Sequence, residues 1–322
     1  MHAPAIARAA GIELSRLEDR RFEGGEFKLR PLDSVRGKTA FVLQSLAAVS
    51  EPTVCERLVR LLFLMKGLRD AGAERLIAVV PYLAFARKDR RTQLRDPVSS
   101  RYVAELLEAS GMDRLIALDV HNPAALDNAF RVGVDHLSAI PMMVDHFART
   151  ATTGGLTVVS PDVGGIKRAQ LCREMLERRM GHEAGLAFIE KRRALGEVSG
   201  GRVIGEVRGR HLIVLDDLSA TGGTLIRAAE ACKASGAREI SLAVTHVPAP
   251  AVLKALTGHE AVDTVVVTDS VLADLSAAPG AALGGKLVVL AVAPLLGHAI
   301  HRICAGIPLA PLLERWPVSE GT

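Results

Sequence analysis

The feature that most constrains the fold of this chain is a repeated alternation of short apolar runs with longer segments of helical period. In the first half, apolar runs at 39–46, 75–82 and 114–120 alternate with helical patterns at 55–72 and 99–111. The same alternation resumes at LTVVSPD and continues through RHLIVLDD, LIRAAEACKASG, EISLAVTH and DTVVVTDS. Such alternation is typical of βα units that feed a mainly parallel sheet. The sequence therefore predicts an α/β fold in two halves.

An internal echo supports a division by duplication. Residues 68–80 (LRDAGAERLIAVV) resemble residues 232–244 (CKASGAREISLAV), since each is a helix end, a Gly-Ala turn and a buried strand. Residues 113–119 and 263–269 form a second pair in the same order. Any two βα units share part of this pattern of helix end, turn and strand. Because both pairs of similar segments occur in the same order, they favour two related domains. The boundary between the domains is expected in the segment 138–155, which ends in a Thr/Gly-rich stretch.

Composition excludes several classes of function. Only 3% of the residues are aromatic, so stacked recognition of nucleic-acid bases has few platforms, and we expect no nucleic-acid partner. No apolar run reaches the ~18 residues that span a bilayer, so we expect no membrane partner. The four cysteines show no CxxC or zinc spacing. Together these features predict a cytoplasmic protein, and the net charge of +4 suits phosphorylated ligands.

The stretch VLDDLSATGGTL (214–225) carries the strongest chemical signal. It predicts a strand that ends in Asp216 and Asp217, followed by a turn and the start of a helix. Backbone N–H groups at a helix start, the helix dipole and the turn hydroxyls converge on an anion, which favours a phosphate. The residues of this predicted phosphate turn are Thr221, Gly222, Gly223 and Thr224. The two acids suit sugar hydroxyls or a hydrated magnesium ion.

This stretch resembles the phosphoribosyl-binding motif of the phosphoribosyltransferase fold. Further landmarks narrow the resemblance to the ribose-phosphate pyrophosphokinase family, over nearly the whole chain. They are RRFEGGE, PYLAFARKDRR, DPVSSRYVAELLEASG, DVHNPAALDNAF, VVSPDVGGIKRA, KRR, VVVTDS and VAPLLGHAIHRI. The resemblance implies two phosphoribosyltransferase-like domains, with the site in the cleft between them. Its implied parts are an N-terminal domain at 1–140, a C-terminal domain at 141–290 and a segment at 291–322 that packs back on the first.

The resemblance also implies an activity and its participants. Members of the family transfer diphosphate from ATP to the anomeric hydroxyl of ribose 5-phosphate, release AMP and require Mg²⁺. Arg87 and Asp89 would lie beside ATP, in a loop whose arginines suit a polyphosphate. Phe22 and Glu26 would reach the adenine across a subunit boundary, which implies a homo-oligomer, a dimer or a hexamer.

The metal ligands and the catalytic cations are implied in the same way. His121 and Asp162 each follow a predicted strand, where open α/β sheets place ligands, and the family holds its magnesium there. Lys191 and Arg193 lie in a segment (EKRRALGEVSGGRV) whose glycines and charges predict a mobile lid, with an exposed hairpin tip carrying ordinary charges as the alternative. Cations that a lid delivers would stabilise charge on the transferring phosphoryl group. These two residues are the predicted catalytic pair.

Several positions depart from the family pattern. Ala220 replaces an acid that approaches the ribose hydroxyls, Gly24 replaces an acid or amide, and Lys88 replaces a glutamine and adds charge to a cationic loop. The segment 122–130 also differs, and the family's first strand has no counterpart before the first helical pattern, so we expect either a truncated start or a missing edge element. Two alternatives to an active pyrophosphokinase therefore stay open: a non-catalytic regulatory subunit, or a phosphoribosyl enzyme of altered sugar-phosphate specificity.

Overall fold

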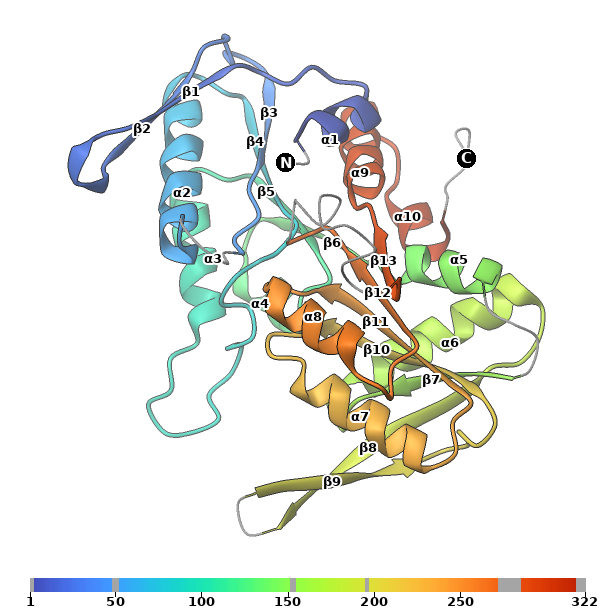
Figure 1. Ribbon diagram of the computed structural model, residues 1–322. Helices are drawn as coiled ribbons and strands as arrows, with labels where there is room; N and C mark the ends of the chain where they lie inside the picture. Colours follow the sequence, from blue (N-terminus) through green and yellow to red (C-terminus); the bar gives the residue numbers. More distant parts are fainter. Residues whose placement is uncertain (1–2, 48–51, 151–154, 195–196, 272–284, 317–322) are drawn as a thin grey trace. The chain divides into compact units, whose positions relative to one another are not determined.

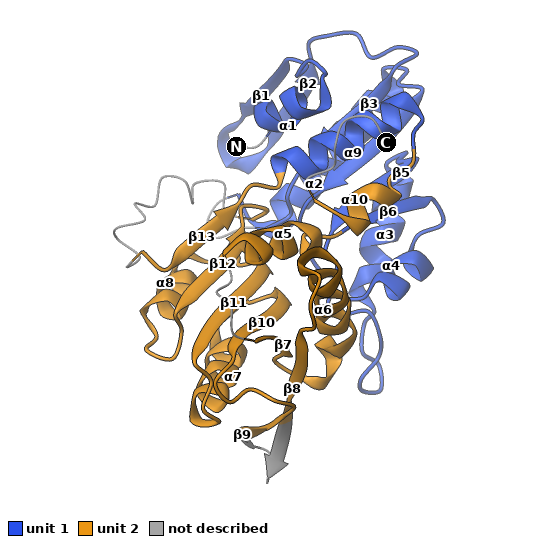
Figure 2. Ribbon diagram, turned by 90° about the vertical axis from the view of Figure 1, so that its right-hand side faces the viewer, with its two compact units in different colours: residues 1–137, 293–307 blue, residues 138–292, 308–322 orange. Residues whose placement is uncertain are grey.

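The computed structural model describes residues 3–47, 52–150, 155–194, 197–271 and 285–316. These residues divide into two compact units, coloured separately in Figure 2. Unit 1 is Met1–Leu137 with Ala293–Ile307, and unit 2 is Ser138–Val292 with Pro308–Thr322. The chain therefore enters unit 2 and returns to unit 1 for its long C-terminal helix. The functional domains expected at 1–140, 141–290 and 291–322 stay predictions.

Unit 1 is built on a four-stranded parallel sheet with the order β3-β4-β5-β6 (Figure 1). The strands are β3 (Thr39–Leu43), β4 (Arg75–Val80), β5 (Arg114–Leu118) and β6 (Gly133–Leu137). The helices that connect them are α2 (Val54–Asp70), α3 (Ser99–Ala109) and α4 (Pro123–Ala129). Two of these helices have side-chain caps, because Thr53 accepts from the Glu56 N–H and Asn122 accepts from the Ala125 N–H.

Alternating strand residues build two cores in unit 1. Leu76, Ala78 and Val80 pack with apolar residues of α2 and α3. The intervening Ile77 and Val79 are fully buried and face the other side of the sheet, because successive side chains point to opposite faces. Figure 1 shows α1 (Ala3–Ala10) and α9 (Ala293–Ala305) on that side. A Cβ on Gly297 would lie 2.4 Å from the Ala9 Cβ, so glycine permits this close helix pairing.

An antiparallel hairpin projects from unit 1. Its strands are β1 (Leu17–Arg21) and β2 (Phe27–Pro31), joined by the short 3₁₀ turn η1 (Glu23–Gly25). Several contacts with α2 hold the hairpin. The Arg60 guanidinium lies 4.9 Å from the centroid of the Phe27 ring and also pairs with Asp19. In addition, Arg21 pairs with Glu56 at 2.6 Å, and the Phe27 ring lies 5.6 Å from that of Phe63. The hairpin tip itself is exposed.

Unit 2 contains a seven-stranded sheet with the order β13-β12-β11-β10-β7-β8-β9. The strands are β7 (Leu156–Ser160), β8 (Gly185–Ala194), β9 (Glu197–Ile204), β10 (His211–Leu218), β11 (Glu239–His246), β12 (Thr264–Thr268) and β13 (Leu287–Leu290). All neighbouring strands are parallel except β8 and β9, which form an antiparallel hairpin. The expected α/β fold with mainly parallel sheets is confirmed, whereas the internal duplication stays a prediction.

Helices cover both faces of this second sheet. On one face, α7 (Gly223–Ala234) and α8 (Pro250–Gly258) pack on the apolar residues of β10, β11 and β12. The other helical elements are η2 (Val163–Gly165), α5 (Ile140–Thr150), α6 (Ile166–Met180) and α10 (Ala310–Glu314), with α5 packed against α6 in Figure 2. In both units, no helix among the described residues is long and apolar enough to cross a bilayer.

Candidate active site

The carboxyl edge of the unit 2 sheet gathers most of the predicted site residues. β7 and β10 are parallel neighbours, and Asp162 follows the first while Asp216 and Asp217 end the second. β8, the other neighbour of β7, pairs with it only at Gly185–Phe188 and then extends through Lys191 and Arg193. Parallel strands present their carboxyl ends at one edge, so these predicted ligands share that edge.

The predicted phosphate turn is an open helix start. Gly222 is the N-cap of α7, with φ +80°, and no side chain caps the helix. A left-handed conformation of this kind favours glycine, and a Cβ there would lie 3.3 Å from the Leu256 side chain. The Ser219 N–H donates to the His246 carbonyl at 2.9 Å, which fixes the turn to the end of β11. The helix dipole and its N-terminal N–H groups are thus available to an anion.

Arg168 clamps the two acids that precede this turn. Its Nη1 donates to Asp217 Oδ1 at 3.0 Å and lies 3.4 Å from Asp216 Oδ1. The Asp217 side chain is only 6% exposed and that of Asp216 is 20% exposed. A nearly buried carboxylate is costly without a cationic partner, so Arg168 holds the pair in place. Arg168 was not among the predicted site residues, although it lies within the landmark VVSPDVGGIKRA.

Asp216 titrates far from its ordinary range. Burial, followed by the hydrogen bond with Asp217 and the charge of that residue, raises the pKa of Asp216 to about 7, while the Arg168 charge opposes the rise. The unfolded chain keeps the ordinary value of 3.8. The free energy of unfolding therefore falls as pH rises through this interval, because the unfolded chain loses the proton first.

This linkage gives a prediction for Asp216→Asn, which stays neutral at every pH. The variant should gain stability relative to the parent as pH rises from 5 to 8, by at most about 1.4 kcal/mol per pH unit. Urea denaturation of both proteins at several pH values measures the difference. For Asp127→Asn, an exposed control on α4, the difference from the parent should not change with pH. An Asp216→Asn curve parallel to the parent curve would contradict the assignment.

Asp162 already has a structural role. Its Oδ1 accepts hydrogen bonds from the Gly164 and Gly165 N–H groups at 3.0 and 3.2 Å, which starts the turn η2. His121 belongs to unit 1, where it is exposed just beyond β5. Among the described residues, no group of three or more His, Cys, Asp or Glu side chains is placed to hold a metal ion. A metal at either position would therefore need further ligands from substrate or water.

Unit 1 brings the predicted nucleotide loop to the end of β5. Asp89 Oδ2 accepts from Asn122 Nδ2 at 2.7 Å, and Asn122 directly follows His121. Arg87 is exposed in the same loop. The sequence analysis assigned no role to Asn122, which also caps α4. A contact between residues 33 positions apart leaves no local sequence signal.

Phe22 and Glu26 lie at the tip of the β1–β2 hairpin. The Phe22 N–H donates to the Glu26 carbonyl at 2.8 Å, and the Arg20 guanidinium lies 5.1 Å from the Phe22 ring centroid. The ring is 42% exposed. No hydrogen bond or ion pair within the described part of unit 1 joins this tip to Arg87 or Asp89. Phe22 is thus partly exposed, with Arg20 over one face of its ring, and no such bond between described residues links it to the nucleotide loop.

Lys191 and Arg193 lie on a strand, whereas the sequence predicts an irregular lid. Lys191 pairs with Gly201 and Arg193 with Val198 in the β8–β9 hairpin, with a register shift after Lys191. Residues 195–196 of the expected lid lie outside the described residues. Packing explains the glycine at position 201, because a Cβ there would lie 2.0 Å from the Ile189 Cγ2.

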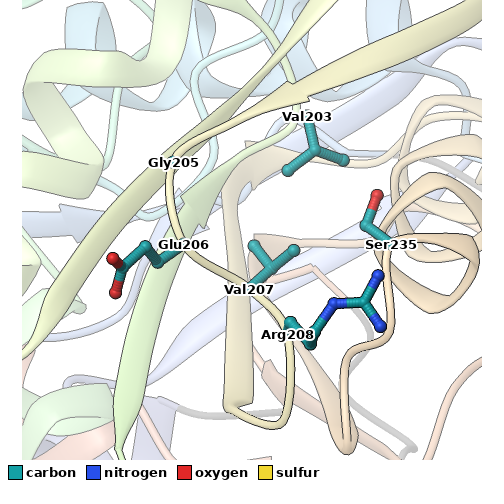
Figure 3. A pocket seen from close by; sticks show the side chains of 6 residues that line it. All are labelled: Val203, Gly205, Glu206, Val207, Arg208 and Ser235. Atoms are coloured by element: carbon teal, nitrogen blue, oxygen red, sulfur yellow. The ribbon is translucent and has the colours of Figure 1, made fainter.

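A surface hollow of about 380 Å³ lies elsewhere in unit 2 (Figure 3). Its lining residues are Val203, Gly205, Glu206, Val207, Arg208 and Ser235. Residues 205–208 precede β10 and Ser235 follows α7, so the hollow lies at the amino end of β10. The acids and the phosphate turn follow the carboxyl end of the same strand, which separates the hollow from the candidate site.

Comparison with known proteins identifies the relatives of this chain. Residues 2–111 match the family model for the N-terminal domain of ribose phosphate pyrophosphokinase, and residues 141–271 match the phosphoribosyl transferase domain. Ribose-phosphate pyrophosphokinase 1 of Streptococcus pneumoniae is 36% identical over 97% of this chain and 93% of its own length. The protein of the same name from Lactococcus lactis is 36% identical over 99% and 94%. The crystal structure of phosphoribosylpyrophosphate synthetase from Mycobacterium smegmatis superposes with a TM-score of 0.83 at 30% identity, covering 95% of each chain.

Proposed function

The chain belongs to the ribose-phosphate pyrophosphokinase family, and we propose that it transfers diphosphate from ATP to the anomeric hydroxyl of ribose 5-phosphate, releasing AMP. The observation that carries this proposal is the uncapped start of α7 directly after the Arg168-clamped acids. A phosphomonoester on the α7 N–H groups places its sugar hydroxyls toward carboxylate acceptors. Nearly full-length similarity to named relatives supports the same activity.

The residues divide the chemical work. The 5-phosphate binds at Thr221–Thr224, and Asp216 and Asp217 accept hydrogen bonds from the ribose hydroxyls. The anomeric hydroxyl oxygen attacks the β-phosphorus of ATP and releases its proton to solvent, and the bond between that phosphorus and the oxygen of the departing AMP breaks. Lys191 and Arg193 stabilise the charge that develops on the phosphoryl oxygens.

The nucleotide side is assigned to unit 1. We place the ATP phosphates at Arg87 and beside Asp89, with the adenine on the Phe22 ring and near Glu26 of a second subunit. That arrangement makes a dimer the smallest active unit and is compatible with a hexamer. The free thiols of all four cysteines suit a reducing cytoplasm.

Magnesium fits one of the two proposed donors, the Asp162 carboxylate. This ion prefers oxygen and is usually held by one or two carboxylates together with substrate phosphates and water. Asp162 supplies such a carboxylate. His121 is an unusual nitrogen donor and would fill one further coordination position of the ion. We propose that these two residues hold Mg²⁺ with ATP. When bound, the ion screens the charge of the phosphates.

The test of the proposed function is nucleotide analysis of purified protein incubated with MgATP, with and without ribose 5-phosphate. AMP should form only when the sugar phosphate is present. Ribose 5-phosphate-dependent ADP, or no nucleotide change at all, would contradict the proposal.

Ala220 offers a second prediction at this site. It is exposed in the turn between Asp217 and Thr221, where the family carries an acid. Ala220→Asp restores an acceptor for a ribose hydroxyl and should lower the KM for ribose 5-phosphate about fivefold, since the net contribution of a typical hydrogen bond is about 1 kcal/mol. Ala220→Asn is the uncharged control and should have the smaller effect. A KM that rises in both variants would show that the acid does not face the sugar.

A further inference from the structure

The nucleotide loop of unit 1 contains an ion pair that the sequence does not reveal. Lys88 Nζ pairs with Asp96 Oδ2, across eight positions of chain. The same Asp96 oxygen accepts from Thr92 Oγ1 at 2.7 Å and from the Thr92 and Gln93 N–H groups at 3.0 Å. These bonds hold the pKa of Asp96 well below its usual range. The charge of Lys88 is thus neutralised within the loop, in contrast to the added cation that the sequence suggests.

The backbone of Lys88 is fixed at the same time. Its carbonyl accepts from the Ser100 N–H in the first turn of α3 at 3.2 Å, and its N–H donates to the Phe85 carbonyl at 3.3 Å. The neighbouring Asp89 bonds to Asn122 at the start of α4. One end of the loop is therefore anchored to two helices, and the Lys88 side chain connects the other end to that anchor.

Backbone strain at Arg95, at the C-terminal end of the loop, gives the Lys88–Asp96 ion pair a structural role. Arg95, directly before Asp96, has φ +68°, a left-handed conformation that costs a non-glycine residue about 1 kcal/mol or more. Such a conformation persists only where surrounding contacts hold it. The bonds to the Asp96 side chain, together with the bond from the Asp96 N–H to the Gln93 carbonyl at 3.3 Å, hold this end of the loop and supply that restraint.

The remaining cations of the loop contrast with Lys88. Arg87, Arg90, Arg91 and Arg95 are exposed, and none of them makes a hydrogen bond or ion pair with the described residues. Like charges this close along the chain repel one another, because the Debye length is about 8 Å at physiological salt. Without a restraint, the loop would spread. With the restraint, the four unpaired guanidinium groups stay close together in this loop.

We propose that Lys88 and Asp96 form a tie that positions the arginines and Asp89 of this loop for the phosphates of ATP. The tie is a positioning device and does not itself contact the nucleotide. The proposal rests on the proposed function for its ligand. It assigns a role to Lys88, a position at which this chain departs from the family's glutamine.

The first test is steady-state kinetics of Lys88→Gln, Asp96→Asn and the double variant. Each single change should raise the KM for ATP about three- to fivefold, in line with a partly exposed ion pair, while kcat stays within about twofold. The KM for ribose 5-phosphate should not change. The double variant should be no worse than Asp96→Asn alone, because both changes break one interaction. Lys88→Arg should restore most of the parent's ATP affinity.

A matched control separates the tie from a general charge effect. Lys66 pairs with Asp70 on α2 at 3.2 Å, and both side chains are exposed. Lys66→Gln removes the same charge from the same unit and should leave the KM for ATP unchanged. An equal rise in KM in this control would overturn the proposal.

A second readout needs no enzymatic activity. An arginine-specific endoprotease cuts after Arg91 and Arg95 but not at position 88, so Lys88→Gln removes no cleavage site. Cleavage at these two bonds should be at least about threefold faster in Lys88→Gln than in the parent or Lys66→Gln, since the rate of cleavage follows the population of the open loop.

Unchanged cleavage together with an unchanged KM would overturn the tie, and faster cleavage with an unchanged KM would overturn its role in ATP binding. If the parent makes no AMP, the proposed function fails, and ATP titration calorimetry of the same variants decides the positioning role.

Discussion

Lys191→Ala is expected to lower kcat by about two to three orders of magnitude, the usual effect of removing a donor that stabilises transition-state charge. The KM for either substrate should change little, because the interaction forms mainly as charge develops on the transferring group. Arg193→Ala should show the same pattern. Steady-state rates of AMP formation at saturating substrates measure the loss.

The control for this prediction is Arg192→Ala, which removes a cation from between the two catalytic candidates on the same strand. Its kcat should stay within about threefold of the parent. A large loss of kcat in Arg192→Ala, together with a parent-like kcat in Lys191→Ala, would show that a different cation of the hairpin is catalytic.

Gly222→Val is expected to raise the KM for ribose 5-phosphate by about 30- to 100-fold. The substitution forces a β-branched side chain into a left-handed backbone at φ +80° and against Leu256. The α7 N–H groups then shift, and a hydrogen bond to a charged ligand contributes about 1.5–3 kcal/mol. Titration calorimetry with ribose 5-phosphate measures the loss directly.

Gly209→Val is the matched control. Gly209 also has a left-handed backbone, at φ +70°, with open space around it, and it precedes β10 rather than following it. Both variants should lose thermal stability from backbone strain, and Gly222→Val should lose more because its side chain also crowds Leu256. Only Gly222→Val should lose affinity for ribose 5-phosphate. Equal affinity in the two variants would contradict the assignment of the phosphate turn.

Local chemistry explains why the strand, turn and helix around the proposed phosphate site were predictable from sequence. A buried strand, two acids, a glycine pair and a helical pattern occupy one continuous stretch, and each signal acts over a few residues. The structure places Gly222 at the N-cap of α7, where that stretch predicts the turn. The parallel sheets follow from the same kind of local periodicity.

Contacts between distant residues could not be predicted in the same way. Arg168 reaches Asp216 and Asp217 across 48 and 49 positions, and Asp89 reaches Asn122 across 33. These pairings depend on the order of the strands in the sheet. The length of the β8–β9 strands was not predicted for a different reason. Glycine in this segment indicates a loop by composition, whereas Gly201 allows close packing against Ile189.

The most direct test of the central claim is a phosphorus NMR time course of the purified protein with MgATP and ribose 5-phosphate. The account predicts that AMP and a sugar bearing a diphosphate on its anomeric carbon appear in equal amounts. It also predicts that neither product forms with Lys191→Ala on the same timescale. Appearance of ADP with a singly phosphorylated anomeric carbon would contradict diphosphate transfer, and a spectrum without change would contradict catalysis by this chain.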